Sequence, residues 1–491
     1  MRFSAGLLFI SAVTLSSCYV APDIPESTFG ELTLDIETPD VFRLSNGLEV
    51  WRFSAQVPLA SCRLIVRGGS KSDPAGKEGL CSLAMDLLDE GAGELDALKL
   101  ADEIEFLGAD LSVSTSKEYS VLSLNVLEKN FDAALSILRD VLSAPKMAQA
   151  DFDRVHELTL NSLKMRVREP NAVSRVVGTR SFFGDESRWA HPENGYVASV
   201  QALGLSDAKS AIETNLHPEN SVLLVSTRLS SEELSQRLEK SLAAWMGFGS
   251  RDELPPSPEP RAGPAQRLVV VHRPDAAQTV ISVYLPGFAW GGGESASHEL
   301  INLVLGGSFT SRLNSNLRED KKITYGAGSG LAKHSRPSYH IARTSVESKS
   351  TRLGLTEVYR EIHGISMGDI SSDELLKARS TWRARIVASM ESQASVLGLF
   401  ETFAANGRKP SEVQAFHAAV LSADPSKFAE FCAQLYDWNR ALVVLVGDEG
   451  VIEKAIGELE SEDLREEQGI PGWAIGKPNR VDEEGSAVSA E

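Results

Sequence analysis

The stretch NRALVVLV, residues 439–446, decides the fold because the chain contains its pattern twice. Residues 220–225 read NSVLLV, and in both places an amphipathic segment typical of a helix follows, at 231–245 and 451–459. The two leading asparagines lie 219 positions apart (439 − 220), and the strands predicted to open each half, near Ala60 and Ala277, lie 217 apart (277 − 60). A nearly constant shift of this kind indicates an internal duplication.

Length and composition bound the possible classes of protein. At 491 residues the chain is too long for one ordinary core, and 42% apolar with 24% charged residues is typical of folded globular proteins. The net charge of −19, with no dense basic stretch, argues against nucleic acid as a partner. An acidic surface suits basic peptides, or serves only to keep the protein soluble.

The N-terminus has the features of a targeting segment. Arg2 is followed by the apolar run 3–15, which is too short to span a bilayer, and then by Leu-Ser-Ser-Cys18. The tetrapeptide resembles a bacterial lipoprotein signal, which implies cleavage before Cys18, lipidation of that cysteine and anchoring in the cell envelope. Tyr19 then implies the outer membrane, facing the periplasm. The alternative is an ordinary secretory signal with a chance cysteine.

We therefore predict an α+β fold of two duplicated α/β-sandwich halves joined by a proline-rich linker. The hairpin signal Asn46-Gly47 opens the first half, a helix is expected from about Gly79, and the region from Pro170 to His191-Pro192 is predicted to be rich in loops. The predicted boundaries are 1–17 signal peptide, 18–41 polar leader, 42–249 first half, 250–266 linker, 267–462 second half and 463–491 acidic flexible tail.

The chain lacks the common local signatures of catalysis. It contains neither HExxH nor HxxEH, no GxSxG elbow and no phosphate-binding loop. His298-Glu299 comes nearest to a zinc motif, but position 302 is Asn, so the histidines are expected to be surface or capping residues. Cys62, Cys81 and Cys432 form no CxxC pair and are expected to be small buried residues.

A second stretch, LGGSFTSRLNSNLREDKKITY at 305–325, contains a glycine pair and ends with Arg318 and Tyr325, seven positions apart. This stretch and four shorter pieces occur in the order and at the spacing of a known family. The shorter pieces are LSNGL at 44–48, VRGGS at 66–70, Gly79-Leu80, and Arg273-Pro274 with Gln278. From about residue 42 to 460 the chain resembles the pitrilysin/insulinase-type zinc metallopeptidases, including the mitochondrial processing peptidase branch.

The resemblance implies a zinc site that this chain has lost. In the family, the helix after the Gly-Leu pair carries HxxEH, with two histidine ligands and a glutamate base, and a glutamate further along is the third ligand. The matching positions here are Ser82, Met85 and Asp86, and the third falls near Asn161 and Ser162. A thioether cannot act as a base and one carboxylate cannot hold Zn²⁺. We expect no metal in this chain.

The resemblance also implies that Arg318 and Tyr325 contact the substrate near the scissile bond, because single-chain members carry such a pair. A guanidinium and a phenol can both donate hydrogen bonds to a developing oxyanion. The alternative is that Arg318 is one more exposed charge and Tyr325 a strand residue at a sheet edge. Gly306 and Gly307 either line a substrate groove or form a turn.

These observations lead to two hypotheses. In the first, the chain is the metal-free subunit of a heterodimeric peptidase acting on peptides, with zinc in a sister chain that carries HxxEH. In the second, it is a non-enzymatic binding or scaffold lipoprotein of the same fold. A pure scaffold has no need of Arg318 and Tyr325, so this pair separates the two.

Overall fold

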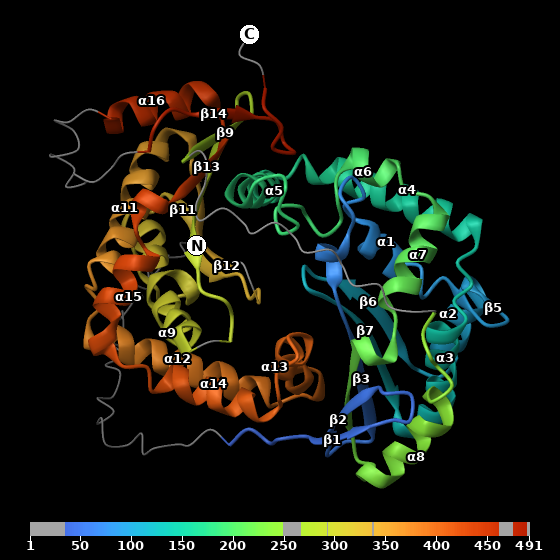
Figure 1. Cartoon of the computed structure of the whole chain (residues 1–491). Helices are drawn as coiled ribbons and strands as arrows, with labels where there is room; N and C mark the ends of the chain where they lie inside the picture. Colours follow the sequence, from blue (N-terminus) through green and yellow to red (C-terminus); the bar gives the residue numbers. More distant parts are fainter. Residues whose placement is uncertain (1–34, 249–266, 292, 336–337, 461–474, 489–491) are drawn as a thin grey trace, which may run out of the picture. The chain divides into compact units, whose positions relative to one another are not determined.

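The computed structural model describes residues 35–248, 267–291, 293–335, 338–460 and 475–488 (Figure 1). Residues 36–491 form one unit. The predicted signal peptide with Cys18, most of the leader and the whole of the proline-rich linker lie outside the described residues. The end of the leader is tied to the second half, because the amide of Ile36 donates to Gln414 Oε1 at 2.9 Å.

The first half is built on a six-stranded sheet with the order β1-β2-β8-β3-β7-β6. The predicted hairpin at Asn46-Gly47 is confirmed: β1 and β2 pair antiparallel, and Gly47 has a φ of +89°. β2 and β8 run parallel, whereas the other neighbours are antiparallel. The strands are β1 Asp40–Arg43, β2 Glu49–Ser54, β3 Leu59–Arg67, β6 Asp110–Thr115, β7 Tyr119–Leu127 and β8 Ser221–Thr227.

Helices cover this sheet and bury their apolar stripes against it. In α3, for example, Phe131, Leu135, Leu138 and Leu142 fall at helical spacing and are buried in the core of the first half. The main helices of this half are α1 Leu80–Met85, α2 Ala97–Phe106, α3 Phe131–Ser143, α4 Gln149–Arg166, α6 Val197–Gln201, α7 Leu205–Asn215 and α8 Ser231–Leu242.

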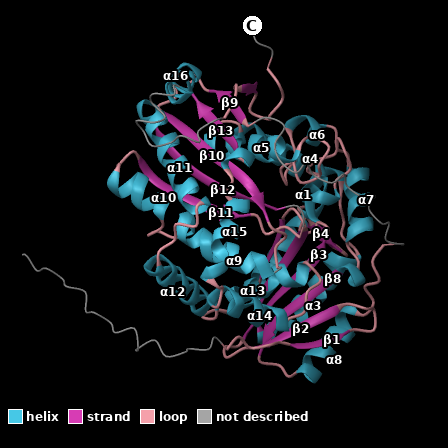
Figure 2. Cartoon of the chain, turned by 60° about the vertical axis from the view of Figure 1, so that its left-hand side comes forward, coloured by secondary structure: helices cyan, strands magenta, loops and turns pink. Residues whose placement is uncertain are grey.

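The second half repeats five of these six strands, as the duplication predicts; its sixth strand comes from the C-terminal end and runs parallel to its neighbour, whereas β1 is antiparallel to β2. Its sheet has the order β11-β12-β10-β13-β9-β14, and the parallel pair β13 and β9 corresponds to β8 and β2 (Figure 2). The two repeated sequence stretches therefore form the matching strands β8 and β13. The strands are β9 Leu268–His272, β10 Gln278–Gly287, β11 Thr324–Leu331, β12 Ser338–Glu347, β13 Leu442–Gly447 and β14 Asn479–Val481.

The stretch 305–325 falls in a series of short helical segments that leads into the edge strand β11. These segments are α9 Gly293–Asn302, η5 Leu303–Gly307, α10 Arg312–Asn314 and η6 Ser315–Asp320. The remaining helices are α11 Thr351–Ser366, α12 Ser372–Ser389, α13 Gln393–Ala405, α14 Ser411–Leu421, α15 Phe428–Leu435 and α16 Glu449–Glu460. None of the described helices is long and apolar enough to cross a membrane.

Each half contributes one helix to the sheet of the other. α13 packs on β3 and β8, with Phe400 against Phe53 (ring centroids 4.8 Å apart) and an ion pair of 2.5 Å between Arg63 and Glu401. α5, Pro170–Phe183, packs on β10 and β13, where Ser174 Oγ donates to Ser282 Oγ at 2.8 Å. The exchange ties the halves together through residues more than 100 positions apart.

Two predictions about local structure are wrong. The region after Pro170 was predicted to consist of loops, but it begins with α5, because Pro170 occupies the first turn and the apolar side of the helix is buried under the sheet of the second half. The tail at 463–491 was predicted to be flexible, yet residues 479–481 form β14 in parallel register with β9, and Asp482 begins a hydrogen-bonded turn. In both cases distant partners stabilise a segment with a weak local pattern.

Candidate functional site

The positions that correspond to the zinc motif lie on α1. Ser82 and Met85 are buried in this short helix, and Asp86 is its C-cap. Ser82 Oγ donates to Asn194 Oδ1 at 3.3 Å, and Met85 belongs to the hydrophobic core. Both side chains are therefore occupied with packing and hydrogen bonding inside the first half.

Asp86 is the one carboxylate among these positions. Burial, together with the nearby carboxylates of Asp89 and Glu90, raises its pKa to about 6. Ser162 is exposed on α4, and among the described residues no three His, Cys, Asp or Glu side chains are grouped to hold a metal ion. A hydroxyl, a thioether and one carboxylate do not fit Zn²⁺, so we derive no catalytic step through this ion here.

A buried carboxylate fixes the start of α1. Asp73 accepts hydrogen bonds from the amides of Gly79 (2.8 Å) and Cys81 (2.7 Å). Burial nevertheless raises its pKa to about 7, and burial lowers the pKa of the nearby Lys117 ammonium. No motif in the sequence marks Asp73. The one local sign of its role is that an acidic residue stands a few positions before the glycine that opens the helix.

Arg318 lies on η6 and stacks on an aromatic ring. Its guanidinium carbon is 4.7 Å from the ring centroid of Phe309, and its Nε is 3.4 Å from Glu319 Oε1. The Arg318 side chain is 38% exposed, and Phe309 is exposed as well. The stacking leaves a charged group at the surface with a restricted orientation.

Tyr325 projects from a β-bulge in the edge strand β11. The register with β12 shifts between Thr324 and Ala327, so that Tyr325 and Gly326 together oppose one residue. Thr344 Oγ1 donates to Gly326 O (3.1 Å), and Gly326 N donates to Thr324 Oγ1 (3.1 Å), which fixes the bulge. The Tyr325 side chain is 92% exposed, the largest exposure among the exposed large hydrophobic side chains described.

Gly306 and Gly307 lie where η5 ends and approaches β11. A Cβ on Gly306 would lie 2.3 Å from Ser329 N, and one on Gly307 would lie 2.8 Å from Asn302 Nδ2. Both glycines permit close approach between backbone segments. The structure thus brings Gly306 against the strand that carries Tyr325, and η6 with Arg318 also contacts this strand.

The expectation that the histidines are surface or capping residues is wrong for part of the second half. His298 and His340 are buried with ring centroids 5.5 Å apart, and Tyr436 lies 4.6 Å from His340. Both ring nitrogens of His340 lack a hydrogen-bond partner among the described residues. Burial lowers the pKa of His340 to about 3. The cysteines, in contrast, are buried as predicted.

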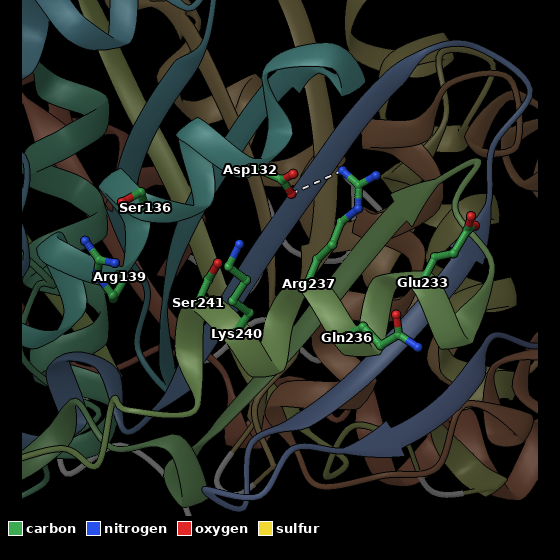
Figure 3. A pocket seen from close by; sticks show the side chains of 8 residues that line it. All are labelled: Asp132, Ser136, Arg139, Glu233, Gln236, Arg237, Lys240 and Ser241. Carbon is green, nitrogen blue, oxygen red and sulfur yellow. Dashed lines mark hydrogen bonds and ion pairs between the residues drawn. The ribbon is translucent and has the colours of Figure 1, made fainter.

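Figure 3 shows a separate groove, on the outer helices α3 and α8. Its charges are mixed, and one ion pair within it joins Arg237 to Asp132 at 3.1 Å. The residues that line it come from α3 and α8 and include none of the predicted site residues.

Two family descriptions match the chain. Residues 52–180 match the description "Insulinase (Peptidase family M16)" and residues 202–381 match "Peptidase M16 inactive domain". The chain belongs to peptidase family M16. The resemblance inferred from the motifs is thereby confirmed. The range that matches the insulinase description contains Ser82, Met85 and Asp86, the residues predicted to correspond to the zinc motif.

The chain is also similar to individual proteins. An uncharacterized zinc protease of Mycobacterium leprae is 24% identical over 341 residues, which is 68% of this chain and 75% of the relative. A non-peptidase homolog, YmxG of Helicobacter pylori, is 23% identical over 302 residues, 60% of this chain and 68% of the relative.

Solved structures agree with the predicted fold. The crystal structure of a peptidase M16 inactive domain from Pseudomonas fluorescens superposes with a TM-score of 0.76 at 21% identity. The superposition covers 84% of this chain and 98% of the other. The two-half α+β fold is confirmed, and the chain, as a member that matches the inactive-domain description, is consistent with a non-catalytic peptidase-like protein.

Proposed function

We propose that this protein is the metal-free subunit of a heterodimeric M16 peptidase. The observation that carries the proposal is an asymmetry between the halves. The zinc positions on α1 hold side chains that do not fit the metal, whereas Arg318 and Tyr325 are both exposed beside one edge strand. In this proposal a sister chain with HxxEH supplies zinc and its activated water, and this chain supplies Arg318 and Tyr325.

The two residues act on the peptide carbonyl in this proposal. The Tyr325 phenol donates a hydrogen bond to the carbonyl oxygen as negative charge develops on it, and the Arg318 guanidinium stabilises the same charge. The bulge supports the role of Tyr325, because bulges re-aim side chains next to active sites. Gly306 and Gly307 support the role indirectly, because they let η5 pack closely against the strand that carries Tyr325 and against its own preceding turn.

The test uses the purified full chain and the HxxEH partner recovered with it by pull-down from a detergent extract. The chain alone should bind no stoichiometric zinc and cleave no peptide, and the mixture should cleave. Tyr325→Phe and Arg318→Ala should each lower turnover about a hundredfold, with assembly unchanged. Lys349→Ala, which removes an exposed charge elsewhere, is the matched control. Normal turnover by both variants would exclude the assigned role.

A second candidate is a non-enzymatic scaffold of the same fold. It is favoured by the relative named a non-peptidase homolog. Under this candidate no HxxEH chain copurifies with the protein, and substitution of Tyr325 changes nothing that can be measured beyond local stability.

The proposed location is the bacterial cell envelope, through lipid on Cys18. The support is the Leu-Ser-Ser-Cys sequence after a short apolar run. Acyl chains contribute about 0.8 kcal/mol per buried CH₂, so two or three chains hold a protein firmly at a membrane. Cys18→Ala should move the protein from the membrane fraction to the soluble fraction of cells, and retention in the membrane fraction would contradict the anchor.

A further inference from the structure

Two arginines, Arg175 and Arg343, lie where α5 crosses the sheet of the second half. α5 is fixed there because Tyr284 OH donates to Ser174 O at 3.3 Å, and Ser345 Oγ donates to Asn171 Oδ1 at 3.4 Å. Arg175 lies one helical turn after Asn171. Arg343 lies on β12, two residues before Ser345, and so on the same face of the strand.

Both guanidiniums are free to bind an anion. Arg175 and Arg343 are exposed, and neither side chain has a hydrogen bond or ion pair within the described part of the chain. The nearest carboxylate along this face of β12, Glu347, pairs with Lys349 at 2.7 Å.

The two positive charges act on the same pair of phenols. Burial raises the pKa of Tyr339 to about 12 and holds the pKa of Tyr284 well above its usual value, and Arg175 and Arg343 both oppose these rises. The hydrogen bonds agree with this, because Ser282 stands opposite Arg343 in the register of β10 and β12 and accepts from Ser174, the residue before Arg175.

A small cavity of about 80 Å³ adjoins Arg175. Its lining includes the ammonium of Lys117, whose side chain is 7% exposed, and the indole of Trp189, whose buried Nε1 has no acceptor among the described residues. The one carboxylate in the lining belongs to Glu193, at 3.8 Å from Lys117. A donor without an acceptor, next to two cations, suits a ligand carboxylate.

The strand beside Arg343 leaves space for a ligand. In the register of β11 and β12, Gly328 stands opposite Arg343 and Gly330 opposite Ile341. A Cβ on Gly330 would meet no atom within 4 Å. A Cβ on Gly328 would lie 3.1 Å from Gly306 O, so the open part of β11 is at Gly330, one pleat beyond the residue opposite Arg343, and an extended segment can approach it there.

We infer that this face, formed by Arg175, Arg343 and the cavity at Lys117 and Trp189, binds an acidic peptide segment. The guanidiniums pair with side-chain carboxylates, and the cavity takes one further carboxylate. A peptide is favoured over a nucleic acid because the cations are few and lie next to an edge strand, not along a basic stripe. This inference specifies which class of peptide the proposed function would act on, and it rests on that proposed function.

The experiment measures fluorescence anisotropy of labelled extended peptides with the full chain. One peptide alternates glutamate and valine, and matched peptides carry glutamine or lysine in place of glutamate. The chain should bind the glutamate peptide about tenfold or more tightly than the glutamine peptide, and the preference should fall as salt rises. The double variant Arg175→Gln/Arg343→Gln should abolish the preference. Arg237→Gln, in the outer groove, is the matched control and should retain it.

Several outcomes would overturn the inference. They are equal binding of the three peptides, loss of the preference in Arg237→Gln, and displacement of the glutamate peptide by a single-stranded oligonucleotide of equal charge at lower concentration. If the glutamine peptide binds and is cleaved once the partner is added, but no acidic preference exists, this inference fails while the proposed function stands. If no peptide binds and no mixture cleaves, the proposed function fails with it. Circular dichroism confirms that each variant is folded.

Discussion

Replacing His340 by phenylalanine should remove part of the acid sensitivity of the second half. His340 lies on β12 between His298 and Tyr436, at ring-centroid distances of 5.5 and 4.6 Å, with no carboxylate hydrogen-bonded to its ring. Burial lowers its pKa from 6.5 to about 3. The folded protein therefore holds a neutral imidazole, while the unfolded chain takes up a proton below pH 6.5.

The sign and size of the effect follow from this difference. As the pH falls from 6.5 towards 3, the unfolded state binds one more proton than the folded state, so stability is lost. Each pH unit in this window costs about 1.4 kcal/mol, so His340 alone lowers the free energy of unfolding by about 2 kcal/mol between pH 7 and pH 5. Burial also lowers the pKa of His298, and the nearby His340 lowers it further, with an effect of the same sign.

The assay is urea unfolding followed by circular dichroism at pH 7, 6 and 5. His340→Phe keeps a ring of similar size and removes two ring nitrogens that lack partners, so its stability at pH 7 should lie within about 1 kcal/mol of wild type. Between pH 7 and pH 5 it should lose about 2 kcal/mol less than wild type. His272→Gln removes an exposed histidine of β9 and is the control. Equal pH dependence in wild type and His340→Phe would refute the reasoning.

Two further predictions concern packing within and between the halves. Gly306→Ala places a Cβ 2.3 Å from Ser329 N and should destabilise the protein by about 1–3 kcal/mol in the same urea assay, whereas Gly330→Ala, with no atom within 4 Å, should cost less than about 1 kcal/mol. Equal losses in the two variants would contradict the close approach of η5 to β11. A double-mutant cycle on Arg63 and Glu401, whose atoms lie 2.5 Å apart between the halves, should give a coupling of about 1 kcal/mol, and additive single effects would mean that α13 does not bind the first sheet through this pair.

The proposed peptide-binding surface differs in charge from the one that the composition favours. From the net charge of −19, basic peptides were one possible class of partner for an acidic surface. The structure places Arg175 and Arg343 together on one face of the second sheet, and no local pattern in the sequence marks either residue. They lie 168 positions apart (343 − 175), on a helix of one half and a strand of the other. Only the exchange of α5 between the halves brings them close.

The sequence by itself determined the duplication, the two-half α+β fold, the family and the loss of the zinc ligands. These features depend on local patterns and on fixed spacing, such as the repeat of 220–225 at 439–446 and the residues Ser82, Met85 and Asp86. The tertiary structure decided the helical state of 170–183, the pairing of β14, the burial of His340 and the bulge that exposes Tyr325. The physical reason is that each of these depends on a partner distant in sequence, whose packing and hydrogen bonds outweigh the local preference of the segment.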